Sequence, residues 1–229
     1  MKYDVILWDV DGTLLDFEYS ERYSLVKCLE EIGVKATEEI ITRYSEINIG
    51  WWKRLEKGEV TKAELLHGRF YDLVSEFQID CEDILSLRLR YQEYLGSVYK
   101  YMDDSISICK RLQGKVKQYV VTNGVTHTQE NKLKLSGFDK VMDGCFISEQ
   151  MGVPKPHREF FDKVFESMPE ISKERILIVG DSLTSDIEGG IRAGIDTCWY
   201  NPEHAENDGT VNMTYTIQQL DEIFGILEG

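Results

Sequence analysis

Short apolar runs alternate with helical stretches through the second half of this sequence, and this alternation limits the fold more than any other feature. Strands are predicted over residues 118–122, 141–147, 176–179 and 197–200. Helices are predicted over residues 105–112, 126–135, 158–168, 185–193 and 217–227. Strands joined by helices of about ten residues form βαβ units, whose strands run parallel. Right-handed crossovers then place helices on both faces of one sheet.

A further apolar run, residues 5–8, ends at Asp9, and its β-branched and aromatic content predicts a buried strand. From Tyr19 to about Tyr99 the apolar residues instead recur at helical spacing, with a capping box at Thr61 and Glu64. The chain is therefore predicted to form one α/β core, interrupted after its first strand by an all-helical insert. We place the core at residues 1–15 and 100–229 and the insert at residues 16–99.

The composition excludes several classes of protein. Hydrophobic residues make up 42% of the chain, which is enough for a sizeable core. The net charge of −15 argues against binding to a nucleic-acid polymer or an anionic membrane. Asp4, Asp9 and Asp11 interrupt any signal peptide, and the five cysteines include no C-x-x-C pair. We expect a cytoplasmic protein, and its oligomeric state is left open.

Polar residues gather where the predicted strands end. In an open parallel sheet, ligands bind beyond the carboxyl ends of the strands. The residues found there, or in a loop between them, are Asp9, Asp11, Thr122, Asn123, Lys155, Asp181 and Asp186. Each of these residues on its own is common in turns or on protein surfaces. Their joint occurrence at successive strand ends predicts one crevice rich in carboxylates.

Four motifs of this chain resemble the signature of the HAD (haloacid dehalogenase-like) hydrolases. They are Asp9-x-Asp11-Gly12-Thr13-Leu14, Thr122-Asn123, Lys155-Pro156 and Gly180-Asp181-Ser182-x-x-x-Asp186. The resemblance covers the whole chain, and the helical insert resembles the C1-type cap of that superfamily. It implies a Rossmann-like, doubly wound parallel sheet with an inserted all-helical cap domain.

The resemblance also implies catalytic roles. Asp9 would be the nucleophile that attacks phosphorus, and Asp11 the general acid and base. Thr122, Asn123 and Lys155 would bind the phosphoryl oxygens, with Lys155 also neutralising charge beside the nucleophile. A carboxylate is competent as a nucleophile towards phosphorus only when the charge of the phosphate is screened.

The metal implied by the resemblance is Mg²⁺. Its ligands would be Asp9, the backbone carbonyl of Asp11 and Asp181, with support from Asp186. Hard oxygen ligands of this kind are those that Mg²⁺ prefers. Haloacid dehalogenases keep the first aspartate and lack the second, because a departing halide needs no proton. Asp11 therefore favours a phosphate ester as the substrate.

The insert resembles one branch of the superfamily, the pyrimidine 5′-nucleotidases. The resemblance lies in Ile47-Asn48, the stretch 51–61, Arg69-Phe70, the stretch 180–190 and Trp199-Tyr200-Asn201-Pro202. It implies hydrolysis of nucleoside 5′-monophosphates to nucleoside and phosphate. Aromatic rings can stack on a nucleobase, and Phe17, Trp51 and Trp52 are the candidates. We expect one of the two tryptophans to pack inside the cap and another aromatic residue to line the base pocket. The alternative is that all of these aromatic residues belong to the core of the cap.

Two other functions stay open. A sugar-phosphate or phosphoglycolate phosphatase would share the core motifs and differ in its cap contacts. A catalytically silent protein could bind a phosphorylated ligand in the same crevice. A catalytically silent protein would need neither a nucleophile nor an acid. The chain carries the complete set of catalytic and binding residues, which argues against such a protein: Asp9, Asp11, Thr122, Lys155 and Asp181.

Overall fold

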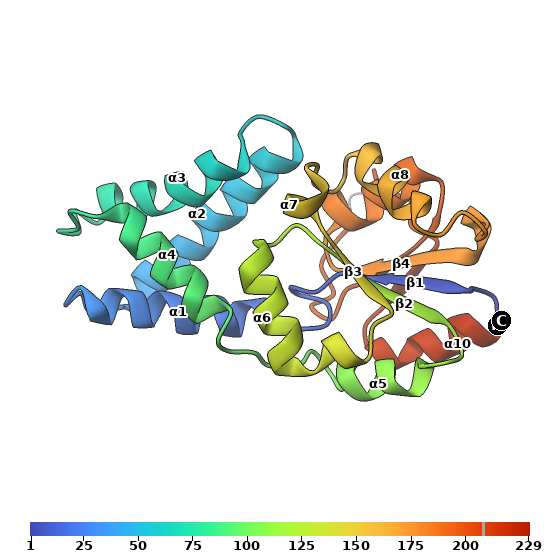
Figure 1. Cartoon of the computed structure of the whole chain (residues 1–229). Coiled ribbons are helices and arrows are strands. Elements are labelled where there is room, and N and C mark those ends of the chain that lie inside the picture. The colour runs from blue at the N-terminus through green and yellow to red at the C-terminus, as the bar shows by residue number, and fades with distance from the viewer. Residues whose placement is uncertain (208) are drawn as a thin grey trace.

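A six-stranded parallel sheet forms the centre of the α/β part of the molecule, at the right of Figure 1. The structure is a computed structural model, and it describes residues 1–207 and 209–229. The strands are β1 (Val5–Trp8), β2 (Lys117–Thr122), β3 (Gly144–Ile147), β4 (Ile176–Gly180), β5 (Asp196–Tyr200) and β6 (Tyr215–Ile217). Their order across the sheet is β3-β2-β1-β4-β5-β6. The predicted doubly wound α/β class is confirmed.

The first strand lies inside the sheet, although a long insert follows it. β1 pairs with β2 on one side and with β4 on the other, both in parallel register. The chain winds outward through β2 and β3, then returns and winds the opposite way through β4, β5 and β6. The direction of winding therefore changes between β1 and β4. In sheets of this type the crevice at that change is where ligands bind.

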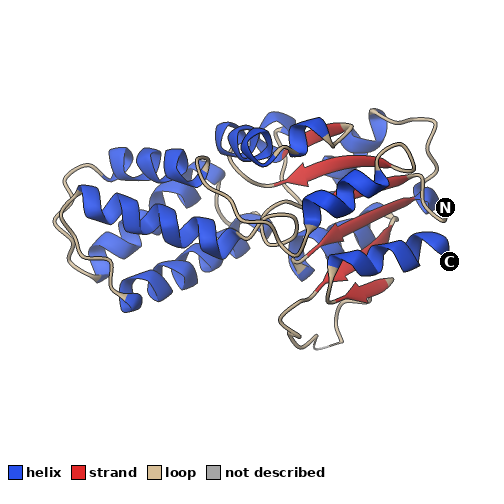
Figure 2. Ribbon diagram, turned by 90° about the horizontal axis from the view of Figure 1, so that it is seen from below, coloured by secondary structure: helices blue, strands red, loops and turns tan. Residues whose placement is uncertain are grey.

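Both faces of the sheet are covered, which explains why its central strands read as unbroken apolar runs. Ile6 and Trp8 of β1 face α5 (Ser105–Leu112) and α10 (Ile223–Glu228), whereas Val5 and Leu7 face α8 (Arg158–Glu166). Figure 2 shows helices on the two sides of the strands. The other core helices are α6 (Thr126–Ser136), α7 (Ser148–Met151) and α9 (Glu188–Ala193).

The insert forms a helical bundle beside the sheet, at the left of Figure 1. Its helices are α1 (Phe17–Glu31), α2 (Glu38–Glu56), α3 (Lys62–Glu76) and α4 (Ile84–Leu95). The bundle has its own apolar core, in which the rings of Tyr44, Phe70 and Tyr91 lie 5.2–5.6 Å apart between centroids. The capping box of Thr61 and Glu64 starts α3.

The C-terminal part of the chain differs from the prediction. A helix was expected over residues 217–227, but Ile217 ends the short strand β6. The helix begins only after a 3₁₀ turn at Leu220–Glu222. A strand of three residues is too short to show an alternating pattern, and pairing with β5 stabilises it. The predicted strand at 141–147 likewise shortens to Gly144–Ile147.

No helix within residues 1–207 or 209–229 is both long enough and apolar enough to cross a lipid bilayer.

Candidate active site

A cavity of about 170 Å³ lies at the carboxyl ends of β1, β2 and β4, where the helical bundle meets the sheet. The bundle contributes Phe17, Trp52 and Glu56 to its lining. The core contributes Asp9, Asp11, Thr122, Asn123, Gly124, Lys155, Asp181, Ser182, Ser185 and Asp186. The structure therefore brings all the core residues of the predicted site to one cavity.

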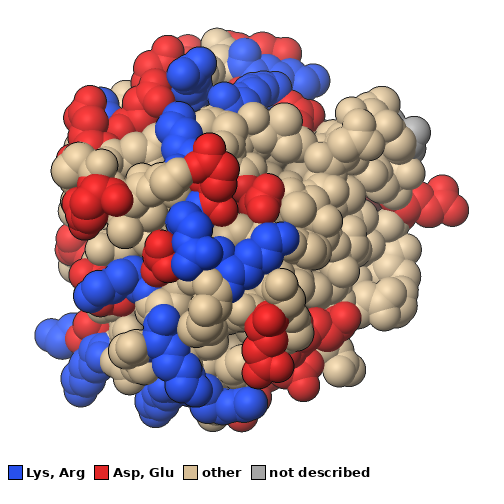
Figure 3. Space-filling model, turned by 90° about the vertical axis from the view of Figure 1, so that its right-hand side faces the viewer, with Lys and Arg blue, Asp and Glu red and all other residues tan. Residues whose placement is uncertain are grey.

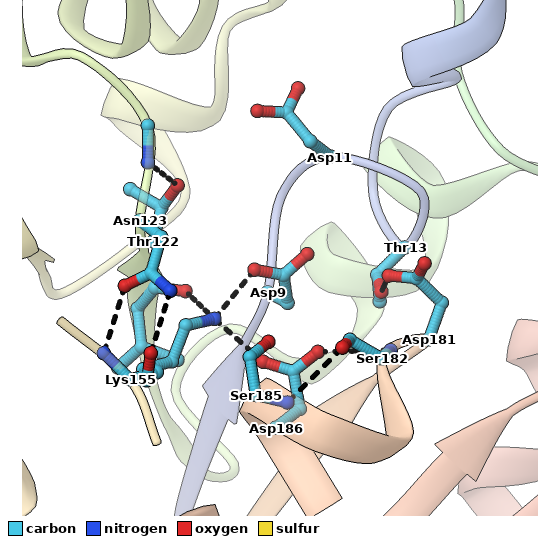
Figure 4. Close-up of polar contacts among 12 residues, drawn as sticks. Asp9, Asp11, Thr13, Thr122, Asn123, Lys155, Asp181, Ser182, Ser185 and Asp186 are labelled. Carbon is cyan, nitrogen blue, oxygen red and sulfur yellow. Dashed lines mark hydrogen bonds and ion pairs between the residues drawn. The ribbon is translucent and has the colours of Figure 1, made fainter. Parts of the chain in front are cut away.

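Lys155 is the centre of the polar contacts in this cavity (Figure 4). Its side chain is only 1% exposed. The ammonium group donates to Asp9 Oδ1 at 2.7 Å, to Asp186 Oδ1 at 2.6 Å and to the Val121 carbonyl at 2.8 Å. These three acceptors use all three of its N–H donors. The Lys155 ammonium thus links Asp9, which follows β1, to Asp186, which follows β4.

Asn123 fixes the loop that carries Lys155. Its side-chain amide donates to the Lys155 carbonyl, and its Oδ1 accepts from the Lys155 backbone N–H, both at 2.9 Å. Thr122 Oγ1 accepts a hydrogen bond from the Gly124 N–H at 3.1 Å. The Thr122 hydroxyl hydrogen can therefore point to an oxygen in the cavity, whereas the Asn123 amide is engaged in positioning Lys155.

Three carboxylates converge on the floor of the cavity. Oxygens of Asp9, Asp181 and Asp186 lie within 4.8 Å of one another. The Thr13 hydroxyl donates to Asp181 Oδ1 at 3.0 Å, and the Ser182 N–H donates to Asp186 Oδ2 at 3.2 Å. These bonds orient the carboxylates towards a common point. Several carboxylate oxygens around one point are a ligand set that suits Mg²⁺.

Gly12 makes room for this cluster. Its φ of +95° lies in a region that side-chain-bearing residues avoid. A Cβ atom at this position would also stand 2.6 Å from Asp181 Oδ2. The turn after β1 can therefore approach the Asp181 carboxylate only if position 12 is glycine.

The cluster carries uncompensated negative charge. Burial raises the pKa of Asp9 well above its usual range, although the adjacent Lys155 ammonium opposes this. Burial and then Asp186 raise the pKa of Asp181 to about 7. Burial lowers the pKa of Lys155, but the adjacent Asp186 and Asp9 carboxylates outweigh this and raise it. Three carboxylates thus share one ammonium, and a divalent cation is the charge that would neutralise the remainder.

The Asp11 carboxylate points away from this cluster in Figure 4. Lys132 of α6 donates to Asp11 Oδ1 at 2.6 Å, and Gln129 of the same helix donates to Oδ2. Lys132 is fully buried. Only the backbone carbonyl of Asp11, not its side chain, was expected to ligate metal. As an acid, Asp11 has to exchange these two partners for the leaving group.

Sequence reasoning missed Gln129 and Lys132. A signal for them exists, because they are three residues apart on the helix that starts directly after Thr122-Asn123-Gly124. Residues at that spacing lie on one helix face. Which way that face turns depends on how α6 packs, and the sequence pattern does not contain this information.

The two neighbouring tryptophans lie in different surroundings. Trp52 lines the cavity together with Phe17. Trp51 packs inside the bundle: a Cβ built on Gly68 would come within 2.2 Å of its ring. Its Nε1 donates to Asp72 Oδ2 at 2.8 Å. The structure thus brings Trp52 and Phe17 to the candidate site and places Trp51 between α2 and α3.

Two polar contacts join the bundle to the core beside the cavity. The Lys62 ammonium, at the start of α3, donates to the Asn123 and Gly124 carbonyls at 2.7 and 2.6 Å. Burial lowers the pKa of Lys62 to about 8. At the end of α2, Glu56 Oε2 accepts a hydrogen bond from Thr184 Oγ1 at 2.6 Å. The bundle is therefore closed over the strand ends in this structure.

Comparison with known proteins identifies the class. The haloacid dehalogenase-like hydrolase family matches residues 3–194. A crystal structure of the HAD-hydrolase YfnB from Bacillus subtilis, bound to magnesium, superposes with a TM-score of 0.94 at 38% identity, over 100% of both chains. The chain belongs to the haloacid dehalogenase-like hydrolases and is an enzyme of that family.

Two further relatives carry more specific names. The pyrimidine 5′-nucleotidase PynA of Streptococcus pneumoniae is 37% identical over 100% of this chain and 96% of its own length. The pyrimidine 5′-nucleotidase YjjG of Escherichia coli is 30% identical over 99% of each chain. The match to both relatives therefore includes the helical bundle as well as the core.

Proposed function

We propose that this protein is a Mg²⁺-dependent phosphomonoesterase that hydrolyses nucleoside 5′-monophosphates, with pyrimidine nucleotides preferred. One observation carries the proposal: the rings of Phe17 and Trp52 line the same cavity as the Asp9 cluster. A flat base can stack on such rings while its phosphate reaches the strand ends. The similarity to PynA and YjjG over nearly the whole chain supports the same substrate class.

The chemistry follows from the positions of the side chains. An Asp9 oxygen bonds to phosphorus, and the bond from phosphorus to the ester oxygen breaks. The departing oxygen keeps the electron pair and takes a proton from Asp11. A water oxygen then bonds to the phosphorus of the aspartyl-phosphate, the bond from phosphorus to the Asp9 oxygen breaks and frees the Asp9 carboxylate, and Asp11 accepts the proton that the water loses. The Thr122 hydroxyl donates to a phosphoryl oxygen during both steps. The Lys155 ammonium, whose three donors are bound to protein acceptors, offsets negative charge beside the nucleophile.

The metal site of the proposal uses the three convergent carboxylates. Asp9, Asp181 and the backbone carbonyl of Asp11 would hold Mg²⁺, with Asp186 orienting the site. Bound there, Mg²⁺ would screen the negative charge of the phosphate and orient it for in-line attack. The helical insert, residues 16–99, acts as a cap that closes over the nucleoside.

A phosphate-release screen tests the proposal. UMP, dTMP, AMP, glucose 6-phosphate and 2-phosphoglycolate are compared with Mg²⁺ and with EDTA. We expect the highest kcat/KM for UMP or dTMP and no turnover in EDTA. Faster release from a sugar phosphate or phosphoglycolate would favour the alternative phosphatase. Asp9→Asn should stop turnover, and Mg²⁺-dependent release that persists in it would contradict the nucleophile assignment.

A pair of tryptophan variants tests the base pocket. Trp52→Ala should raise KM for UMP, because stacking on a base contributes roughly 1–3 kcal/mol, or about 5- to 150-fold. Trp51→Ala is the matched control, since its ring packs within the cap. It should lower the melting temperature and leave KM for UMP near the wild-type value. An unchanged KM in Trp52→Ala would contradict the stacking role.

A further inference from the structure

One acidic side chain of the cap, Glu56, lines the cavity together with Trp52 and Phe17. Glu56 is the last residue of α2, and it follows Trp52 by four positions, so both lie on one helix face. Thr184 Oγ1 donates to Glu56 Oε2 at 2.6 Å and holds the carboxylate in place. Within the described part of the chain, this is the one hydrogen bond of the Glu56 side chain. Oε1 is therefore free to accept another.

Lys53, an exposed cation of the same helix, acts on the Glu56 charge, but it is not among the described residues that line the cavity. Among the described residues that line the cavity, Lys155 is the one cation, and it is bound to Asp9 and Asp186. Lys62 is bound to the carbonyls of the loop after β2, and Lys132 is bound to Asp11. A negative group beside Glu56 would thus find no unpaired cation among the described residues that line the cavity.

We propose that Glu56 determines the leaving-group specificity of this site. It selects phosphate esters whose leaving group is neutral and carries O–H or N–H donors, and it rejects leaving groups with a carboxylate or a second phosphate. The inference rests on the proposed phosphatase function and narrows its substrate class. A carboxylate accepts hydrogen bonds and repels nearby negative charge, and repulsion is strong where water is partly excluded.

The inference separates nucleoside monophosphates and other esters with neutral leaving groups from 2-phosphoglycolate on chemical grounds. A nucleoside is uncharged and offers sugar hydroxyls to Glu56 while its base meets Phe17 and Trp52. Glycolate, the leaving group of 2-phosphoglycolate, carries a carboxylate. The leaving group of UDP carries a phosphate. Discrimination of this kind comes from the repulsive element as much as from the attractive one.

Glu56→Gln tests the proposal, because it removes the charge and keeps the shape. The measured quantity is the ratio of kcat/KM for UMP to that for 2-phosphoglycolate, and likewise for UDP. Burial raises the pKa of Glu56, so the assays are run at pH 8 to favour the ionised carboxylate. We expect each ratio to fall at least tenfold in Glu56→Gln. Glu56→Asp keeps the charge and should retain most of the rejection.

Two control variants separate specificity from cap docking. Glu59→Gln removes the same charge from an exposed position three residues away, and its ratio should stay within twofold of wild type. Thr184→Val removes the hydrogen bond but leaves the Glu56 charge. It should keep the ratio as well. If Thr184→Val reproduced the effect of Glu56→Gln, Glu56 would merely dock the cap, and the proposal would be overturned.

The outcomes also distinguish this inference from the nucleotidase proposal. An unchanged ratio in Glu56→Gln, or a wild-type enzyme that prefers 2-phosphoglycolate to every neutral ester, would overturn the role of Glu56. If the wild type hydrolyses glucose 6-phosphate but no nucleotide, the nucleotide preference fails. The ratio of glucose 6-phosphate to 2-phosphoglycolate then tests Glu56 in the same way.

Discussion

At the scale of single residues, Lys155 determines the geometry of the site. Its ammonium group is buried, and it contacts Asp9, Asp186 and the Val121 carbonyl. Those contacts connect β1, β2 and the segment after β4. The Lys155 ammonium, which would offset the charge of a bound phosphate, therefore also holds the ends of these strands together.

Replacing this lysine should destabilise the metal-free protein. Lys155→Met leaves three carboxylates close together with no cation, and breaking such buried pairs costs roughly 3–5 kcal/mol. Urea unfolding in EDTA measures the change. Lys134→Met, at an exposed position of α6, is the control and should change stability by less than about 0.5 kcal/mol. Equal unfolding midpoints for the two variants would contradict the role of Lys155.

The assignment of Asp11 as the acid predicts a dependence on the leaving group. Asp11→Asn should lower kcat on UMP by roughly 10²- to 10⁴-fold, because its alkoxide leaving group needs a proton. The loss on p-nitrophenyl phosphate should be much smaller, because p-nitrophenolate departs without one. Steady-state rates with both substrates measure the difference. Equal losses would argue against the acid role.

At the scale of elements, the packing of α2 against α3 decides which tryptophan reaches the cavity. Gly68 of α3 leaves space for the Trp51 ring, and the Trp51 Nε1 donates to Asp72 on the same helix. Trp51 is thereby turned into the bundle. Its neighbour Trp52 then faces the strand ends, because adjacent residues on a helix point in directions about 100° apart.

This packing gives a stability prediction. Gly68→Ala would place a Cβ within 2.2 Å of the Trp51 ring, and such overpacking costs about 1–3 kcal/mol. Gly50→Ala is the matched control on α2, because its Cβ would meet open space. It should stabilise the protein by about 0.5–1 kcal/mol, since alanine favours a helix over glycine. Melting temperatures that shift in the same direction would contradict the packing argument.

A second feature of the bundle is a series of hydrogen bonds between three buried polar side chains. Arg69 Nη1 donates to Asn48 Oδ1 at 2.7 Å, and the Asn48 amide donates to Glu21 Oε1 at 2.6 Å. All three side chains are at most 5% exposed. These hydrogen bonds link α1, α2 and α3. Asn48 and Arg69, which contribute to the resemblance of the insert to one enzyme branch, thus pack inside the bundle and support its shape.

At the scale of the whole molecule, the chain carries a net charge of −15. Figure 3 shows Lys and Arg side chains intermixed with Asp and Glu on the face turned to the viewer. The acidity that matters for chemistry is the cluster of Asp9, Asp181 and Asp186 in the cavity. Among the described residues, Lys155 is the one cation paired with this cluster, so binding of a divalent cation should be coupled to pH and to stability.

The pKa of Asp181 sets the direction in which pH changes the stability of the protein and its affinity for Mg²⁺. Asp181 has a pKa of about 7 in the metal-free fold, far above the usual value of an aspartate. The folded state therefore binds this proton more tightly than the unfolded chain, and the contribution of Asp181 to stability falls as the pH rises from about 4 to about 7. Mg²⁺ needs the ionised form. From this group alone, Mg²⁺ should bind roughly tenfold more weakly at pH 6 than at pH 8.

Thermal shifts measure this coupling. Mg²⁺ should raise the melting temperature, and a higher Mg²⁺ concentration should be needed at pH 6 than at pH 8 for the same shift. Asp181→Asn should bind Mg²⁺ weakly at both pH values and lose the pH dependence that comes from this group. A wild-type Mg²⁺ titration that is the same at both pH values would contradict a pKa near 7.

The sequence by itself determined the fold class and the residues at the strand ends. Periodicity separates a run such as Val5–Trp8 from the helical insert, and parallel strands place their carboxyl ends at one edge. Asp9 and Asp181 could therefore be predicted to share a crevice. These signals are local, and the rules that combine them are general.

Only the tertiary structure decided which side chains from other elements reach that crevice. Lys132 holds Asp11, Trp52 rather than Trp51 faces the cavity, and Glu56 lines it. The rotation of α6 and α2 about their axes sets these positions, and it results from packing between residues far apart in the chain. The short strand β6 was missed for the same reason, since its stability comes from pairing with β5.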